Sequence, residues 1–497
     1  MVAGQVGNTF HRAPLIAHLD RCEGKTLATL DVSGVFKRVD GHKKVTGIAG
    51  NVIEQSVLAI PANPRQEPDI VVDGVRYEVK TTGMRKKDAS NEAEAKEPMS
   101  ITAVSPEKIV GEKYFQSHFW NKISHMVLFY YLYDSRDVVP ACKYASFPLL
   151  SYEFHEYEDF TVEERDTLKS DWQRVRNFII FLNNNYRDSE AEYPRISHDL
   201  RSELMLLDTA PKWPNRPRFR FKRTFVTAIY RRHVEKRKRL ESLPQAYTTV
   251  RDIDDKLFEL TVKYRGMTVS ELCSQFGIVL RNTVPKSVAE PVVVKMFGGT
   301  KSKMRDVELF AKIGLVGKSM VLTRDGRRTE DMKFFTIDFE EFATDGMTFE
   351  ESQFYDYFAS SKFLFVLFEE PSAAAPLSDN KFVGFDLVTF DGDFIENHVR
   401  PVWERIRKLV ISRELRDETV VDKYGCPIRN RNGQIRTRTN LPKSCEGIVF
   451  VRGTGTDSTD KPINVNGIPM YRQQVWVKGS YLADVIWRRK ASRQKQG

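Results

Sequence analysis

The sequence predicts an α/β protein of two similar domains in tandem, each a mixed β-sheet flanked by helices. Three observations support this prediction. The chain has 497 residues, which is more than one ordinary domain holds, and its 41% hydrophobic content is enough to fill two cores. A hairpin pattern lies between helical patterns in the first half. Four segments of the first half also recur, in the same order, in the second half.

After its first helical patterns, the first half contains a predicted hairpin over residues 68–80, which read PDIVVDGVRYEVK. Asp73-Gly74 is a strong signal for a two-residue turn, and the residues on either side favour β-structure. Such a turn places Asp69 directly opposite Glu78, with Cβ atoms about 5 Å apart. Glu78 and Lys80 are two residues apart on one strand, so their side chains share a face. The hairpin therefore brings two carboxylates and one amine together.

Two carboxylates and a lysine in this arrangement are typical of metal-dependent nucleases with the PD-(D/E)xK pattern. Carboxylate oxygens suit Mg²⁺, which keeps several of its waters when bound. The ion lowers the pKa of a bound water and stabilises the charge that develops on a phosphodiester during hydrolysis. A lysine beside the ion orients or deprotonates the attacking water. The alternative interpretation is an exposed amphipathic hairpin with a surface ion pair.

The rest of the first half alternates charged and apolar segments. Residues 86–97 are charged and rich in Ala and Ser, which predicts a mobile loop, whereas residues 160–183 have apolar residues at helical spacing. Residues 212–239 contain twelve Lys or Arg and one acidic residue, and basic and aromatic residues alternate over 218–225. A dense basic strand suits phosphate contacts, and the alternative is a solvated edge strand whose charges prevent aggregation. The candidate DNA-binding residues here are Arg218, Arg220, Lys222 and Arg223.

The second half repeats the first at a nearly constant offset in numbering. The matched positions are Gly24 with Gly266, Glu54 with Glu290, Lys80 with Lys318, and Phe225 with Tyr481. We expect the boundary between residues 239 and 252, just before a helical pattern over 253–262, which gives domains over 1–240 and 250–497. Chance similarity of amphipathic segments is the alternative.

The two copies differ at the predicted metal site. Val316 stands at the position of Glu78, and Asp306 is the candidate counterpart of Asp69. A single carboxylate is a poor ligand set for a divalent cation. We therefore expect the second domain to be catalytically degenerate. Its Gly/Thr/Asp-rich segment over 453–466 predicts a loop.

Composition excludes several classes of protein. No stretch approaches the roughly 20 continuous apolar residues of a membrane span, and the N-terminus has no secretory pattern. The five cysteines are scattered without a CxxC spacing, which indicates neither a disulfide framework nor a zinc site. These features indicate a cytoplasmic protein, and the net charge of +10 suits a polyanionic partner.

Taken together, these motifs show that the chain resembles the MutH-like endonucleases, and among them the two-domain restriction enzymes of the Sau-three-A-I type, which recognise GATC. The resemblance covers nearly the whole chain, once per half. It implies restriction-endonuclease-like domains that cleave double-stranded DNA with Mg²⁺. It rests on a combination of motifs: GKTL at 24–27, VIEQ at 52–55, Asp69 with Glu78-x-Lys80, Ser117-His118 followed by Lys122, and FRFKRTF at 219–225.

The resemblance implies a role for each charged residue of the cleavage motifs. Asp69 and Glu78 would ligand Mg²⁺, and Lys80 would serve the attacking water. Glu54 would add a carboxylate at the metal site, and Lys122 would be a second lysine near the scissile phosphate. Without the resemblance, Glu54 is interpreted as a solvated residue of an amphipathic helix. Lys122 would then extend along a core helix with its ammonium in water.

Two departures from the family pattern concern DNA recognition. The mismatch-repair relatives have a tyrosine at the position of Arg220, which puts sensing of hemimethylated DNA in doubt and is compatible with restriction. The family's base-reading arginine has no counterpart in the strand at 202–208, whereas Arg452 in the second half matches it. Arginine suits bidentate contact with guanine. We therefore expect Arg452, together with Lys478, to contact DNA.

The resulting prediction is a type II restriction endonuclease that hydrolyses double-stranded DNA at GATC with Mg²⁺. Its N-terminal domain would cut, and its C-terminal domain would bind DNA and position the substrate or activate the first. One intact site cuts one strand, which predicts a DNA-dependent dimer, and restriction implies a cognate DNA methyltransferase. The alternatives are a nicking endonuclease of mismatch-repair type, a non-catalytic sequence-specific DNA-binding protein, and a basic nucleic-acid-binding protein without specificity.

Overall fold

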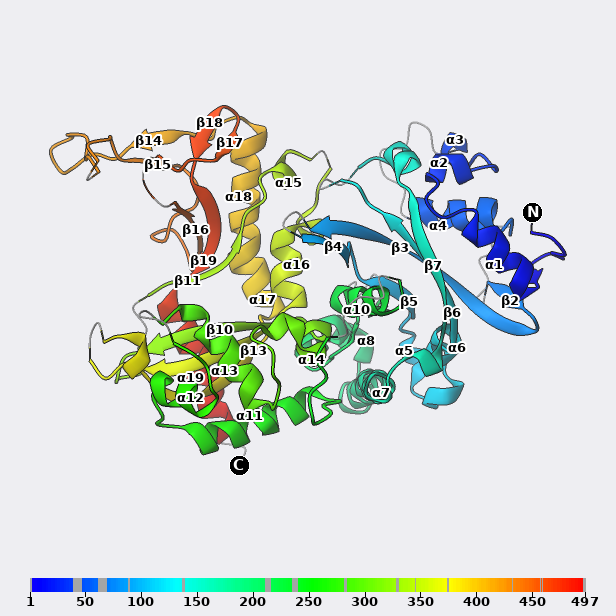
Figure 1. The fold of residues 1–497 in the computed structure, drawn as a ribbon, viewed down its shortest axis with the longest axis horizontal. Helices are drawn as coiled ribbons and strands as arrows, with labels where there is room; N and C mark the ends of the chain where they lie inside the picture. Colours follow the sequence, from blue (N-terminus) through cyan, green and yellow to red (C-terminus); the bar gives the residue numbers. More distant parts are fainter. Residues whose placement is uncertain are drawn as a thin grey trace. The chain divides into compact units, whose positions relative to one another are not determined.

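The computed structural model (Figure 1) divides the chain into two compact units. Unit 1 comprises described residues of 1–135, 139–256 and 293–316, and unit 2 those of 257–292 and 317–497. No helix in the described part of the chain is long and apolar enough to cross a membrane. The described residues are 2–38, 47–60, 69–87, 90–135, 139–210, 216–234, 240–280, 284–327, 330–344, 346–372, 375–430, 432–455, 457 and 459–494.

The main sheet of unit 1 is mixed and has the strand order β1–β2–β3–β6–β7, with β4 paired to the far end of β3. The pairs β1–β2 and β3–β6 are parallel, and β2–β3, β3–β4 and β6–β7 are antiparallel. The predicted α/β class with a mixed sheet is confirmed here. The strands are β1 (Thr9–Phe10), β2 (Ile70–Val72), β3 (Val75–Lys87), β4 (Ser90–Ala95), β6 (His125–Leu132) and β7 (Leu149–Glu156).

Helices cover both faces of this sheet. The N-terminal helices pack on the face that carries Val79 and Phe129, and together they form one apolar core. Helix α10 packs on the opposite face, where the rings of Tyr130 and Tyr230 lie 4.9 Å apart. The helices involved are α1 (Arg12–Asp20), α2 (Leu27–Leu30), α3 (Val35–Arg38), α4 (Ile48–Val52) with the π-helix η1 (Ile53–Val57), α6 (His118–Ile123) and α10 (Arg223–His233).

A second, antiparallel sheet of unit 1 has the order β5–β9–β8, formed by β5 (Met99–Ala103), β9 (Arg218–Phe221) and β8 (Leu207–Asp208). The long helix α7 (Val162–Asn185) supports it, because the buried carboxylate of Asp171 accepts backbone N–H groups from residues 205–207. The remaining elements of the unit include α5 (Pro106–Ile109), η2 (Tyr114–Gln116), η3 (Ala141–Ser146), η4 (Tyr157–Asp159), α8 (Ser189–Glu192), α9 (Pro194–His198), η5 (Asp199–Ser202), η7 (Met304–Asp306) and α14 (Glu308–Lys312).

Among its described residues, the second half of the chain contains two three-stranded sheets, β10–β12–β13 and β11–β19–β16, and two two-stranded ribbons. The strands are β10 (Leu315–Leu322), β11 (Met332–Thr336), β12 (Lys362–Glu369), β13 (Lys381–Val388), β14 (Asp417–Thr419), β15 (Thr437–Thr439), β16 (Val449–Thr454), β17 (Ile463–Val465), β18 (Ile468–Met470) and β19 (Arg472–Val477). The helices are α11 (Val250–Tyr264), α12 (Val269–Gln275), η6 (Lys286–Val288), α13 (Ala289–Met296), α15 (Glu340–Ala343), η8 (Phe349–Glu351), α16 (Gln353–Ser360), η9 (Leu377–Asp379), α17 (Gly392–Phe394), η10 (Ile395–Val399), α18 (Arg400–Ile411) and α19 (Gly479–Gln494).

The internal repeat recurs in the local structure of the two halves. Thr26 caps α2 and Thr268 caps α12 through the same side-chain hydrogen bond to the backbone three residues on. Ser117 caps α6 and Ser352 caps α16 in the same way, each directly after a 3₁₀ turn. In one three-stranded sheet of each half, the strand that comes last in the chain lies in the centre and pairs with the other two. This strand is β9 in β5–β9–β8 and β19 in β11–β19–β16. The division into domains over 1–240 and 250–497 stays a prediction.

Four predicted elements can be compared with the structure directly. The helices expected over 160–183 and 253–262 form as α7 and α11. The mobile loop expected over 86–97 is wrong, because β3 runs to Lys87 and β4 follows from Ser90. A contact with α10 stabilises β4, because the backbone N–H of Ala95 donates to the Thr227 hydroxyl at 2.9 Å and Ala95 is fully buried. The expected loop over 453–466 forms only in part, because β16 and β17 occupy its ends.

Candidate active site

The hairpin β2–β3 has the predicted register. Ile70 pairs with Tyr77 and Val72 with Val75, so the turn consists of Asp73 and Gly74 alone. Both turn residues have positive φ, +46° and +84°, as a type I′ turn requires. Continuing this register by one pair places Asp69 beside Glu78. Glu78 lies near the start of β3, which is an inner strand of the sheet.

Glu78 is the centre of the site. One of its carboxylate oxygens accepts from the Lys80 ammonium at 2.6 Å, and the other accepts from the Lys122 ammonium at 2.6 Å. Glu78 and Lys122 are buried, and Lys80 is half-buried. Because α6 begins at the Ser117 cap, its first turns position Lys122 over β3. The structure thus brings the two predicted lysines onto one carboxylate, and the alternative of an exposed hairpin is wrong.

Asp69 is the second carboxylate of the site, next to Glu78. Its Oδ2 accepts the backbone N–H of Val79 at 2.9 Å, which fixes the side chain against the opposite strand. Desolvation raises the pKa of Asp69, and the nearby charge of Glu78 raises it further. The folded protein therefore holds two carboxylates closer than their mutual repulsion favours, which is the electrostatic condition for binding a divalent cation.

Glu54 is a third carboxylate in this region, near enough to Asp69 and Glu78 for their charges to act on it. It lies on the π-helix η1, and π-helical turns occur frequently at functional sites. Burial raises its pKa to about 6, and the charge of Asp69 contributes in the same direction. Asp69 and Glu78 both act on Glu54, so the helix brings it within electrostatic reach of the predicted ligands. Glu54 is half-buried, so it is less solvated than the interpretation as an amphipathic-helix residue expects.

The raised pKa of Glu54 makes a prediction for the metal-free protein. A carboxyl whose pKa is higher in the folded state stabilises the fold fully below its unfolded pKa of 4.5, and this contribution is lost as the pH rises through about 6. We expect Glu54→Gln to gain stability relative to the wild type between pH 4.5 and 7. Thermal melts of both proteins in EDTA at the two pH values measure the difference. An unchanged difference would contradict the account.

The second half lacks this arrangement at the matching positions. The ammonium of Lys318 donates to the backbone carbonyls of Lys333 and Phe334, at 3.0 and 3.3 Å, where Lys80 instead pairs with a carboxylate. Burial lowers the pKa of Lys318 to about 8. Counting from the two serine caps, Tyr357 occupies the place of Lys122.

The basic strand β9 alternates as predicted, with Phe219 and Phe221 buried and Arg218 and Arg220 facing outward. Arg218 is exposed and donates to the Ser100 hydroxyl at 2.9 Å. Arg220 forms two hydrogen bonds to the carboxylate of Asp208, at 2.6 and 3.1 Å.

Two of the predicted DNA-binding residues lie where the chain turns from β9 into α10. Lys222 differs from the expectation of a residue that contacts phosphate, because it is buried and donates to the Leu204 carbonyl at 2.7 Å. Burial lowers the pKa of Lys222. Arg223 is the half-buried first residue of α10, and residues 212–215 and 235–239 of the basic run lie outside the described residues.

In unit 2, Arg452 extends from β16 into a groove. Its guanidinium lies 4.8 Å from the centre of the Trp476 ring and donates to Asp331 at 2.8 Å, and the side chain is 46% exposed. The groove is lined by further basic residues, which are Arg436, Arg438, Lys443 and Lys461. Lys478 is half-buried just before α19, and its backbone N–H donates to the Ile448 carbonyl. Stacking and ion pairing therefore hold the Arg452 guanidinium in a fixed orientation toward a basic surface.

Three residues with metal-binding side chains were not among the predicted site residues. Glu153, His155 and His233 lie together in unit 1. The spacing of Glu153 and His155 on one strand was the available signal, because residues two apart share a face of a sheet. His233 is distant in sequence, and only the packing of α10 on the sheet brings it to the pair.

Comparison with known proteins finds similarity to a mismatch repair enzyme and to a restriction enzyme. Residues 58–171 match the family model of the DNA mismatch repair enzyme MutH. This segment contains the hairpin with Asp69, Glu78 and Lys80, and it also contains Lys122. The chain is also 23% identical over 459 residues to the type II restriction enzyme Sau3AI of Staphylococcus aureus, and the match covers 84% of this chain and 87% of that enzyme. The resemblance therefore extends beyond the matched segment into both halves.

Proposed function

We propose that this chain, a MutH-like enzyme of the Sau3AI type, is a type II restriction endonuclease that hydrolyses double-stranded DNA at GATC with Mg²⁺. The observation that supports this function best is the cluster of Asp69, Glu78 and Glu54 with two lysines on one carboxylate. GATC as the target rests on the resemblance. Cleavage of a short duplex containing GATC, against a duplex with one base pair of the site exchanged, tests it, and equal cleavage of both would contradict it.

The residues present fit a divalent cation. Asp69 and Glu78 would hold it, with Glu54 as a further carboxylate near the site, because carboxylates offer the hard oxygen ligands that Mg²⁺ prefers. When bound, the ion supplies a more acidic water and stabilises negative charge on the phosphodiester. Lys80 would hold and orient the attacking water, and the Lys122 ammonium would stabilise charge on the scissile phosphate. Both ammoniums are preorganised by Glu78, at 2.6 Å each.

The second half would be catalytically degenerate and would bind DNA. Val316 and Tyr357 replace Glu78 and Lys122, and Lys318 contacts backbone carbonyls. The basic groove around Arg452 suits phosphate and base contacts, and Lys478 would contribute to the same binding. On β9, the exposed Arg218 and the Asp208-paired Arg220 would contact DNA. Lys222 and Arg223 would instead order the turn into α10 that presents them.

The single complete site implies cooperation between two copies, because one site cuts one strand. We expect a dimer that forms on DNA, and a cell that makes this enzyme also needs a DNA methyltransferase that protects the same sequence. Sedimentation of the protein with a GATC duplex tests the dimer. Complexes of one protein per duplex under cleaving conditions would contradict it and would favour a nicking enzyme.

Arg452→Ala tests base reading by the second half. Loss of a bidentate contact to a base should weaken binding of the preferred duplex by about 1–3 kcal/mol and leave binding of unrelated duplexes near the wild-type value. Fluorescence anisotropy with both duplexes measures the two affinities. Arg436→Ala, from the same groove, serves as a control for a phosphate contact. An equal loss on all sequences would show that Arg452 contacts phosphate only.

A further inference from the structure

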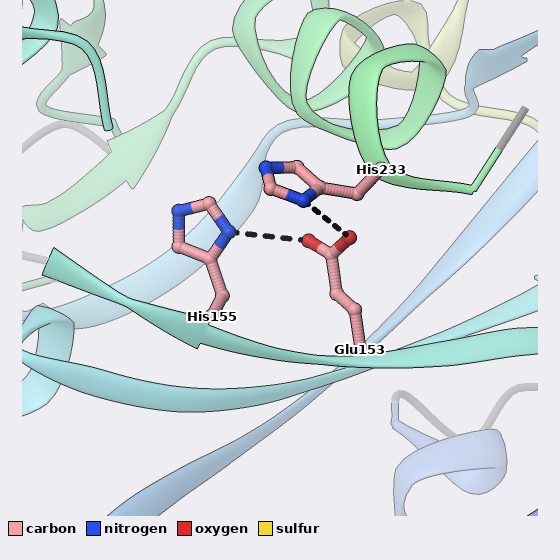
Figure 2. A group of neighbouring side chains, drawn as sticks. All are labelled: Glu153, His155 and His233. Carbon is pink, nitrogen blue, oxygen red and sulfur yellow. Dashed lines mark ion pairs between the residues drawn. The ribbon is translucent and has the colours of Figure 1, made fainter. Parts of the chain in front are cut away.

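A second cluster of metal-binding side chains lies apart from the carboxylates of the active site. Glu153 and His155 extend from one face of β7, and His233 extends toward them from the end of α10 (Figure 2). The Glu153 carboxylate lies 3.3 Å from Nδ1 of His155 and 3.9 Å from Nδ1 of His233. One ligand atom from each residue lies within 4.8 Å of the others. Two imidazoles and a carboxylate thus converge from two separate elements.

His155 of this cluster is buried and the other two side chains are half-buried, and several of their polar atoms have no hydrogen-bond partner among the described residues. The side chain of His155 is 0% exposed, and neither of its ring nitrogens makes a hydrogen bond to a described residue. Nε2 of His233 and one carboxylate oxygen of Glu153 are also buried without a hydrogen-bond partner among the described residues. Buried polar atoms are nearly always satisfied by protein, water or an ion. A fully buried histidine that lies close to a carboxylate without a hydrogen bond to the described residues is therefore a position where a water or an ion would satisfy both side chains.

We propose that Glu153, His155 and His233 bind one divalent transition-metal ion of the Zn²⁺ class. Two imidazole nitrogens and one carboxylate oxygen form a known ligand set for Zn²⁺, and imidazole suits transition metals better than it suits Mg²⁺. Tetrahedral coordination with bonds of about 2.0–2.1 Å places ligand atoms roughly 3.3 Å apart, so small side-chain rotations bring this cluster to that geometry. The Tyr130 hydroxyl donates to Glu153 Oε1 at 3.0 Å and orients the carboxylate as an outer-shell partner.

The register of the sheet separates this site from the active site. Glu78 pairs with Met126, which pairs with His155, and Lys80 pairs with Leu128, which pairs with Glu153. Both sites therefore lie on the same face of the sheet, two strands apart, a spacing of about 10 Å. Apolar Met126 and Leu128 stand between them. An ion at the second site would be structural, because it would join α10 to β7 while the neighbouring carboxylates hold the catalytic ion.

This inference is tested first on the wild-type protein, purified without chelators or a histidine tag. Elemental analysis should find about one zinc per chain after dialysis against Mg²⁺. The protein should lose the zinc in a strong chelator, with a lower melting temperature that returns when Zn²⁺ is restored. Co²⁺ added to the stripped protein should give the visible absorption of a tetrahedral site. Absence of zinc, of a Co²⁺ spectrum and of any Zn²⁺-dependent change in melting temperature would overturn the proposal.

Variants locate the ion. His233→Ala and Glu153→Gln should each lower zinc content and Co²⁺ absorbance at least tenfold, and His233 is the safer site because its side chain is 27% exposed. His125→Ala is the matched control, because His125 also lies 3.3 Å from a carboxylate, that of Glu156, outside the cluster. Glu78→Gln should keep its zinc, and loss of zinc in that variant alone would place the ion in the active site and overturn the proposal. The result is independent of DNA cleavage.

Discussion

Lys80→Ala is expected to reduce cleavage of GATC DNA by about 10²–10⁴-fold while the affinity for the same duplex stays within about twofold of the wild type. The ammonium lies 2.6 Å from Glu78 and is half-buried, so it serves the chemistry of the site and has little surface for phosphate contacts. Single-turnover cleavage with Mg²⁺ measures the first quantity. Binding measured with Ca²⁺ in place of Mg²⁺ measures the second.

Lys318→Ala is the matched control, because it removes the corresponding lysine of the second half. Within the described residues, its ammonium donates hydrogen bonds to two backbone carbonyls, so intrinsic cleavage should remain once the fold is verified by circular dichroism. Complete loss of cleavage in a folded Lys318→Ala protein would show that the second half takes part in the chemistry. Equal loss of binding and cleavage in Lys80→Ala would assign that lysine to phosphate contact.

Two substitutions of the predicted metal ligands should abolish cleavage yet shift stability in opposite directions. Glu78→Gln removes the anion between two ammoniums, one of them buried, and breaking a buried pair in this way costs about 3–5 kcal/mol. Asp69→Asn removes a charge that burial and Glu78 disfavour, while its side-chain carbonyl still accepts the Val79 N–H. The metal-free Asp69→Asn protein should therefore melt above the wild type, and Glu78→Gln should melt below it.

Melting curves in EDTA and cleavage assays in Mg²⁺ test this pair together. Mg²⁺ should stabilise the wild type and have little effect on either variant, because each lacks one carboxylate ligand. Leu128→Met, a neighbouring volume-conserving change, controls for general disturbance of the sheet. Destabilisation of both variants by similar amounts would mean that Asp69 is held by structural contacts and experiences little repulsion from Glu78.

Local chemistry explains which parts of this fold were predictable from sequence. The Asp73-Gly74 turn permits essentially one register, so the opposition of Asp69 and Glu78 followed from strand geometry. The capped helix starts recur in both halves because the sequence repeats their caps, at Thr26 and Thr268 for example. Glu54 and Lys122 depend on packing between distant segments, and family resemblance assigned them where helical periodicity alone did not.

The features that sequence did not predict depend on tertiary contacts. Residues 86–97 are polar and Ala-rich, which is typical of a loop, but pairing with β3 and a contact from α10 make part of them a strand. Lys222 follows a regular alternation, yet the turn into α10 buries its ammonium against a carbonyl. The cluster of Glu153, His155 and His233 joins residues about eighty positions apart, and no local pattern predicts that meeting.

The central claim is that the carboxylate and lysine cluster of unit 1 is a metal-dependent nuclease site. The most direct measurement is Mg²⁺-dependent digestion of a plasmid with mapped GATC sites by the wild type, Lys80→Ala and Lys318→Ala in parallel, with sequencing of the new ends. We predict ends at GATC from the wild type and from Lys318→Ala, and none from Lys80→Ala. Cleavage by Lys80→Ala at the wild-type rate, or wild-type binding of GATC without cleavage in Mg²⁺, would contradict the claim.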